Sequence, residues 1–150
     1  MGEQKQIIER FIAQLWNNRN LAVIDELCTS TYQYHDPSLP SWYAFGRSGL
    51  KDLASSVLTA FPDFRVQIED MVADGELVVT RVTQTGTQTG MLGDLAPTGR
   101  AVSVTAFSVE RFVDGKIAES WGVSDQLGLR EQLGLVRERP PRRRSTTASH

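Results

Sequence analysis

The stretch AVSVTAFSVERFVDGKIAESWGVS, residues 101–124, decides the fold because it predicts two strands joined by one tight turn. Its β-branched and aromatic residues favour strands over residues 101–113 and 116–124. Asp114-Gly115 between them is a typical dipeptide of a hairpin turn. The segment therefore predicts an antiparallel hairpin.

Charge gives a way to predict the register of this hairpin. A two-residue turn would place Glu110 directly opposite Glu119, an unfavourable pair of like charges. A G1 bulge at Gly115 avoids that pair and places Phe107 opposite Trp121. We therefore expect the bulged register.

In that register, one face of the hairpin is mostly apolar with a few ionisable groups, as the wall of a ligand cavity should be. Its members are Thr105, Phe107, Val109, Arg111, Ile117, Glu119, Trp121, Val123 and Asp125. The opposite face is small and weakly polar, and we expect a partner subunit to cover it. It carries Ser108, Ala118, Ser120 and Gly122.

The rest of the chain predicts helices first and strands afterwards, which indicates an α+β domain. Asn20 is expected to cap the second helix, Ser48 the third, and Pro62 to end the third. The expected helices cover residues 7–15, 21–28, 48–60 and 126–133, and the further strands cover 31–35, 64–73 and 77–89. The loop from Ser38 to Gly46 carries three aromatic residues, which favours either a lid over an apolar site or local packing.

Composition and charge exclude several classes of function. The chain has 150 residues, 40% of them apolar, which suits one domain, and we place it at residues 1–136. Residues 137–150 hold five arginines and few apolar side chains, which predicts a disordered tail. The net charge of the whole chain is −2 although this tail carries five arginines against one glutamate. Residues 1–136 are therefore acidic and offer no broad basic face for nucleic acid.

Absent motifs narrow the chemistry further. The single cysteine, Cys28, cannot form an internal disulfide, and no signal peptide or membrane span is evident, so we expect a cytoplasmic protein without membrane contact. The chain has neither the ligand spacing of a metal site nor a glycine motif for dinucleotides or phosphates. We therefore expect acid–base chemistry without a metal or cofactor.

Asp125 is the main candidate for that chemistry, because it lies where the last strand gives way to a helix. At the mouth of an apolar pocket its pKa would rise toward neutrality, which suits a general acid or base. As the cap of the helix that starts at Gln126 it would accept backbone N–H bonds, and its pKa would fall. The sequence leaves both readings open. His35, at the end of the first strand, is likewise either catalytic or a hydrogen-bonded structural histidine.

The sequence as a whole resembles one family, the SnoaL-like polyketide cyclases of the nuclear-transport-factor-2-like superfamily. The resemblance covers nearly the whole chain and rests on the order and spacing of several short motifs. The matching segments are YHDP (34–37), FPD (61–63), TGTQTG (85–90), APTGR (96–100), RFVDGKI (111–117), ESW (119–121), Asp125 and QLG (132–134).

The resemblance implies a fold and an activity. The fold would be a cone-shaped α+β barrel, with helices wrapped on a strongly curved antiparallel sheet, a deep pocket inside the cone and commonly a homodimer. The family's cyclases close a ring on polyketide esters by an intramolecular aldol reaction without metal or cofactor. The resemblance assigns the acid/base role to Asp125. The substrate would be an apolar, polyketide-like small molecule.

The resemblance also suggests residues that bind the substrate. Candidate hydrogen-bond donors are His35, Gln88 and Arg111, and candidate walls are Trp42, Met91, Phe107 and Trp121. The family often has histidine where this chain has Gln88, which cannot titrate, and again at Ser120. Arg111 has a competing structural reading as the ion-pair partner of Glu119.

Three functions therefore remain as hypotheses. The leading one is ring closure on a carbonyl-bearing substrate. The same scaffold also supports hydroxylases, epoxide-opening enzymes and isomerases, and fold alone does not settle the reaction. The third is a non-catalytic, dimeric binder of small molecules.

Overall fold

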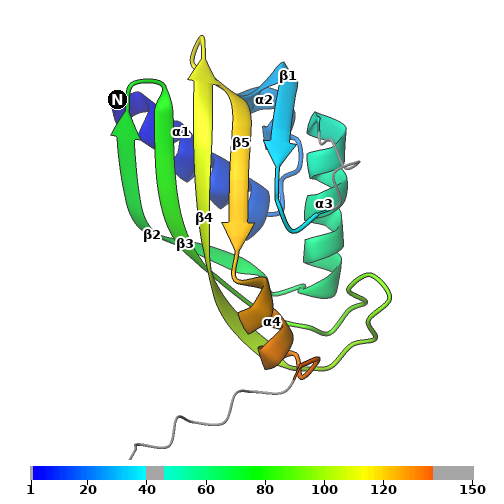
Figure 1. Cartoon of the computed structure of the whole chain (residues 1–150). Helices are drawn as coiled ribbons and strands as arrows, with labels where there is room; N and C mark the ends of the chain where they lie inside the picture. The colour runs from blue at the N-terminus through cyan, green and yellow to red at the C-terminus, as the bar shows by residue number, and fades with distance from the viewer. Residues whose placement is uncertain (1, 40–45, 137–150) are drawn as a thin grey trace, which may run out of the picture.

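The chain folds as helices packed on one face of a curved, five-stranded mixed sheet, as the computed structural model in Figure 1 shows. The structure describes residues 2–39 and 46–136. The helices are α1 (Gly2–Ile12), which continues into the π-helical turn η1 (Ala13–Asn17), α2 (Val23–Leu27), α3 (Arg47–Ala60) and α4 (Gln126–Gln132). The strands are β1 (Cys28–His35), β2 (Arg65–Asp74), β3 (Leu77–Thr87), β4 (Ala101–Val113) and β5 (Lys116–Ser124).

The strand order is β1-β5-β4-β3-β2, with β1 parallel to β5 and all other neighbours antiparallel. The expected α+β fold, a curved sheet wrapped by N-terminal helices with a short C-terminal helix, is confirmed. The aromatic loop residues Trp42, Tyr43 and Phe45 lie outside the described residues, as does the tail from residue 137.

The amphipathic helices formed where the apolar spacing predicts them, but their caps differ. Ala22, not Asn20, is the N-cap of α2, and it makes no side-chain capping bond. The Asn20 side chain lies instead 3.5 Å from Gln14 Oε1. Gly46 rather than Ser48 is the N-cap of α3, and it also makes no side-chain bond. Packing of the apolar faces therefore holds these helices without side-chain caps.

The predicted hairpin turn at Asp114-Gly115 is confirmed, but the predicted G1 bulge at Gly115 is wrong. Asp114 and Gly115 form a two-residue turn, and Val113 pairs with Lys116. Both turn residues have positive φ, 49° and 77°, as a type I′ turn requires. Because the Asp-Gly dipeptide tolerates these angles, the hairpin needs no G1 bulge at its tip.

The hairpin avoids the like-charge pair by a bulge farther along β5. Ala118 is the extra residue there, so that Arg111 pairs with Glu119 and Glu110 pairs with Ser120. Opposite charges replace the pair of carboxylates that a regular ladder would have produced. The same shift places Phe107 opposite Val123 instead of Trp121.

The prediction of which hairpin face lines a cavity is wrong as well. The helices cover the face that was expected to meet a partner, and the opposite face, with Phe107 and Trp121, is the exposed outer side of the sheet. Along β3 and β4, every second residue points to the covered face, and the buried ones are mostly apolar. The covered face is therefore more continuously apolar than the outer face and forms the core. Its buried members include Val78, Val82, Val102, Val104, Ala106, Phe112 and Ile117.

Gln88 holds together the loop between β3 and β4. Its side chain is fully buried and makes four hydrogen bonds. Nε2 donates to the carbonyl oxygens of Gly90 and Ala96, and Oε1 accepts from the backbone N–H and the hydroxyl of Thr98. With all these groups satisfied inside the protein, Gln88 serves the loop and does not line the cavity described below.

Replacing Gln88 by alanine should therefore destabilise the fold. We expect Gln88→Ala to lower the free energy of unfolding by about 2–4 kcal/mol, since it leaves several buried polar groups unpaired. Urea denaturation measures the change. Gln67→Ala, at an exposed position of β2, is the control and should change stability by less than about 0.5 kcal/mol. Equal stability of the two variants would contradict the role of Gln88.

Candidate active site

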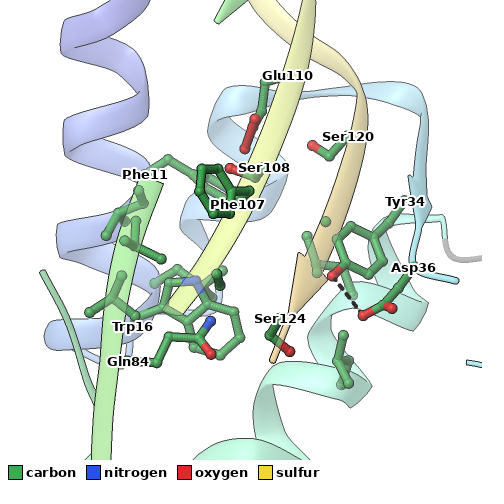
Figure 2. A pocket seen from close by; sticks show the side chains of 18 of the residues that line it. Phe11, Trp16, Tyr34, Asp36, Gln84, Phe107, Ser108, Glu110, Ser120 and Ser124 are labelled. Atoms are coloured by element: carbon green, nitrogen blue, oxygen red, sulfur yellow. Dashed lines mark hydrogen bonds between the residues drawn. The ribbon is translucent and has the colours of Figure 1, made fainter. Parts of the chain in front are cut away.

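A cavity of about 120 Å³ lies between the helices and the covered face of the sheet. Figure 2 shows it from close by, with Glu110, Ser108 and Ser120 toward one end of the view and Trp16 and Gln84 toward the other. Helices α1, η1 and α3 supply an apolar wall because their amphipathic faces point at the sheet. That wall consists of Phe11, Ile12, Leu15, Trp16, Leu50 and Leu53.

The sheet side of the cavity carries a band of polar side chains on an otherwise apolar face. Strand register aligns Glu110 of β4 with Ser120 of β5, and Ser108 of β4 with Thr80 of β3 and Gly122 of β5. All of these except Thr80 line the cavity. The floor of the cavity thus offers hydroxyl groups and one carboxyl group beneath apolar walls.

Glu110 is the most unusual member of this band. The residue is only 7% exposed, and within the described part of the chain its Oε2 atom has no hydrogen-bond partner. Burial raises the pKa of the Glu110 carboxyl group to about 7, an effect that hydrogen bonding from Ser108 partly offsets. The group is therefore poised between its acid and base forms near neutral pH.

Tyr34 and Asp36 occupy the β1 side of the cavity (Figure 2). The Tyr34 hydroxyl lies 3.4 Å from Asp36 Oδ2, and Asp36 Oδ1 accepts bonds from the backbone N–H and hydroxyl of Ser38 at 2.8 and 2.6 Å. Burial raises the pKa of Tyr34, so its hydroxyl stays protonated at neutral pH. Gly122 leaves room for this ring, because a Cβ atom there would lie 2.7 Å from the Tyr34 hydroxyl.

Three residues expected at the site form a separate cluster on the outer face of the sheet. His35 Nε2 lies 2.7 Å from Glu119 Oε2, and Arg111 Nη2 donates to Glu119 Oε1 at 3.1 Å. The His35 ring stacks on Trp121, with centroids 5.4 Å apart and planes at 19°. Hydrogen bonding from His35, with help from Arg111, lowers the pKa of Glu119. The expected ion pair between Arg111 and Glu119 is therefore present, and a contact of Arg111 with the substrate stays a prediction.

Asp125 is exposed and caps α4. Its Oδ1 atom accepts the backbone N–H of Gly128 at 2.8 Å. Gly128 fits this arrangement because a Cβ atom there would lie 2.2 Å from Asp125 Oδ2. Of the two readings of Asp125, the cap is present in the structure, and the residue is not part of the cavity lining. Its acid/base role stays a prediction.

The remaining expected site residues are scattered. Phe107 borders the cavity although it is 47% exposed, whereas Met91 is 51% exposed and lies in the loop after β3, away from the lining. Gln88 is buried in that same loop, and Trp42 falls outside the described residues. The structure thus brings together Trp121, Arg111 and His35, but on the outer face and not in the cavity.

Sequence reasoning missed Glu110 and Tyr34 as site residues. A signal for Glu110 was available, because it falls at the inward position of the alternation that runs through Val102, Val104 and Ala106. A carboxylate at a core position of a strand is rare unless it is paired or functional. Choosing the wrong face of the hairpin concealed this signal.

The described residues contain no group of three or more histidine, cysteine, aspartate or glutamate side chains that could hold a metal ion. Within residues 2–39 and 46–136, none of the helices has the length and apolar character that crossing a membrane requires.

Comparisons with known proteins place this geometry in a family. The model of the SnoaL-like polyketide cyclases matches residues 6–133. No protein with a curated description matches the chain. Among solved structures, AclR from Streptomyces galilaeus, named as a candidate hydroxylase, is 28% identical with a TM-score of 0.83, over 94% of this chain and 91% of AclR.

Two further structures are similar over most of their length. IdmH from Streptomyces antibioticus, named as a candidate polyketide cyclase, is 28% identical with a TM-score of 0.77, over 87% of this chain and 98% of IdmH. TsrD from Streptomyces laurentii is 26% identical with a TM-score of 0.79, over 90% of this chain and 97% of TsrD. Because the family model matches most of this chain, from residue 6 to residue 133, the chain belongs to the SnoaL-like polyketide cyclase family.

Proposed function

We propose that this chain is an enzyme that closes a ring on an apolar, carbonyl-bearing substrate of polyketide type, by acid–base catalysis and without a cofactor. Family membership supports the reaction class. The observation that carries the proposal is the cavity between the helices and the sheet, whose apolar walls enclose a band of hydroxyl groups and a buried carboxyl group. Pockets of this kind orient an apolar ligand through a few polar contacts.

Ring closure of the aldol type needs only proton transfer and a folded substrate. A base removes a proton from the carbon beside a carbonyl group, and the electron pair of the broken C–H bond forms an enolate. The enolate carbon attacks a second carbonyl carbon of the same molecule, and the resulting alkoxide takes the proton back. Apolar walls raise the rate by holding the two reacting carbons together.

The size of the cavity limits how much substrate it receives. Its volume of about 120 Å³ is well below the roughly 300–1,000 Å³ of common ligand pockets. We therefore propose that the cavity holds the reacting end of the substrate and that the remainder extends outward.

A second candidate reaction is hydroxylation on the same scaffold, which the similarity to AclR favours. Epoxide opening and isomerisation are further alternatives, and a non-catalytic binder would use the same cavity without turnover. Hydroxylation adds one oxygen atom and hydrolytic epoxide opening adds one water molecule, so mass spectrometry separates these products from a ring-closed isomer. A double-bond isomer has the same mass as the ring-closed product, and chromatography with NMR separates those two.

A panel of linear aryl 1,3,5-triketones tests the reaction class, because attack of their terminal enolisable carbon on the distant carbonyl carbon closes a six-membered ring. We expect the protein to convert at least one of them to a cyclic isomer or its dehydration product, with no atom gained from ¹⁸O-labelled dioxygen. Liquid chromatography with mass spectrometry, against a reaction without protein, measures the outcome. Incorporation of one oxygen atom from dioxygen would replace ring closure by hydroxylation, and binding without any product would favour the non-catalytic reading.

Asp125 can be tested directly, because asparagine is about as good a helix N-cap as aspartate. If the reaction takes place in the cavity, Asp125→Asn should keep kcat/KM within about threefold and leave stability unchanged within about 0.5 kcal/mol. Steady-state kinetics and thermal unfolding measure both quantities. A loss of activity of 100-fold or more with an intact fold would instead support the acid/base role that the resemblance assigns to Asp125.

The expected homodimer remains a proposal, and we now place its interface on the outer face of the sheet. Strand pairing aligns Val72, Val79, Val109 and Trp121 in one row across β2, β3, β4 and β5. Val72, Val79 and Trp121 are exposed. A continuous apolar row on an uncovered sheet face favours burial against a second copy.

Sedimentation at micromolar concentration tests this interface. We expect the wild-type protein to sediment as a dimer and Val79→Lys to shift it toward the monomer, because a buried unpaired ammonium is costly. Leu127→Lys, at an exposed position of α4 away from the row, is the control and should remain dimeric. A wild-type monomer would contradict the proposed dimer.

A further inference from the structure

We propose that Glu110 is the catalytic acid/base of the cavity and that it acts on an uncharged carbonyl compound. This inference rests on the proposed function, because it names the group that moves the proton and the class of substrate it meets. It assigns the role to a residue on the inner face of β4 and not to Asp125, the exposed N-cap of α4.

Burial of the Glu110 carboxyl group costs free energy of desolvation. Its side chain enters the cavity between Val78 and Ser120, its neighbours on β3 and β5. A carboxyl group at 7% exposure with a free Oε2 atom has lost water without gaining a full set of partners. Buried polar groups left unsatisfied in this way call for an explanation such as a catalytic role. A ligand in the cavity would supply the missing partner.

Among the described residues that line the cavity, Glu110 has no cationic partner with which it could form a structural ion pair. None of the described residues that line the cavity is lysine, arginine or histidine. The titratable groups around Glu110 are Cys28, Tyr32 and Tyr34 of β1, and burial raises the pKa of each of them. Those three groups stay protonated and uncharged at neutral pH, so Glu110 alone among this set changes charge there.

A carboxyl group in this setting meets the requirements of a proton carrier. A pKa of about 7 lets the group accept a proton from carbon and return it to the alkoxide at the same pH. The Ser120 hydroxyl lies in the same polar band and can donate a hydrogen bond to the substrate oxygen, while Ser108 is hydrogen-bonded to Glu110. The other carboxyl group of the lining, Asp36, is engaged by Ser38 and Tyr34.

The charged groups that line the cavity also determine which charge the substrate can carry. The described lining holds two carboxyl groups and no cationic side chain, so an anionic group inside the cavity would meet repulsion without compensation. The reacting end of the substrate is therefore an uncharged ketone, aldehyde or ester.

Glu110→Gln tests the catalytic role, because glutamine preserves the shape of the side chain but cannot carry the proton. We expect kcat/KM to fall at least 100-fold, the lower end of what general acid–base catalysis contributes. The inflection near pH 7 in the wild-type pH profile of kcat/KM should vanish. Glu69→Gln, at an exposed position of β2, is the matched control and should retain wild-type kinetics.

The pH dependence of folding stability reports the titration of Glu110 without any substrate. Because the folded pKa is raised from about 4.5 to about 7, Glu110 binds its proton more tightly in the folded state. Wild-type stability should therefore fall as pH rises from about 4.5 to about 7 and level off above that range. Glu110→Gln should lack this fall, whereas Glu69→Gln should keep it. Denaturant titrations at a series of pH values measure it.

The outcomes separate the two proposals. If the wild type closes rings and folded Glu110→Gln stays within threefold of it, the assignment of Glu110 is wrong while the proposed function stands. If the wild type closes no ring, the proposed function fails and the catalytic role falls with it. A pH-independent difference in stability between the wild type and Glu110→Gln would also overturn the assignment, because Glu110 would not titrate near neutrality.

Discussion

The pairing of β4 with β5 is the interaction on which the rest of the structure depends. The type I′ turn fixes the pairs at the tip, and the extra residue Ala118 shifts every later pair by one. This shift places Glu110 beside Ser120 under the helices and Glu119 beside Arg111 on the outside. Two carboxylates that a regular ladder would set against each other thus enter different environments, one desolvated and one ion-paired.

Those environments explain why the two faces of the sheet suit different tasks. On the outer face, Glu119 is engaged by His35 and Arg111, so this cluster is satisfied within the protein. On the inner face, Glu110 has one carboxyl oxygen without a partner and lies in a cavity. Satisfied networks rigidify a structure, whereas an unsatisfied group in a cavity keeps the capacity to bind. The inner face is therefore where we propose that the chemistry takes place.

Local pattern predicted the elements well and the caps poorly. Apolar spacing located α3 because Pro62 fixes its end, and β-branched runs located β3, β4 and β5. The Asn20 cap failed because the apolar face of α2 is held by packing and needs no cap. The parallel contact of β1 with β5 joins segments far apart in the chain, and no local pattern encodes it.

The sequence by itself determined the order of helices and strands, the alternation of side chains along each strand and the family, because periodicity and motif spacing are local properties of the chain. It could not determine which face of the hairpin the helices cover. Both faces are apolar enough to be buried, and the choice depends on helices and strands brought together from the whole chain. Only the tertiary structure therefore moved the candidate site from Asp125 on the outside to Glu110 within.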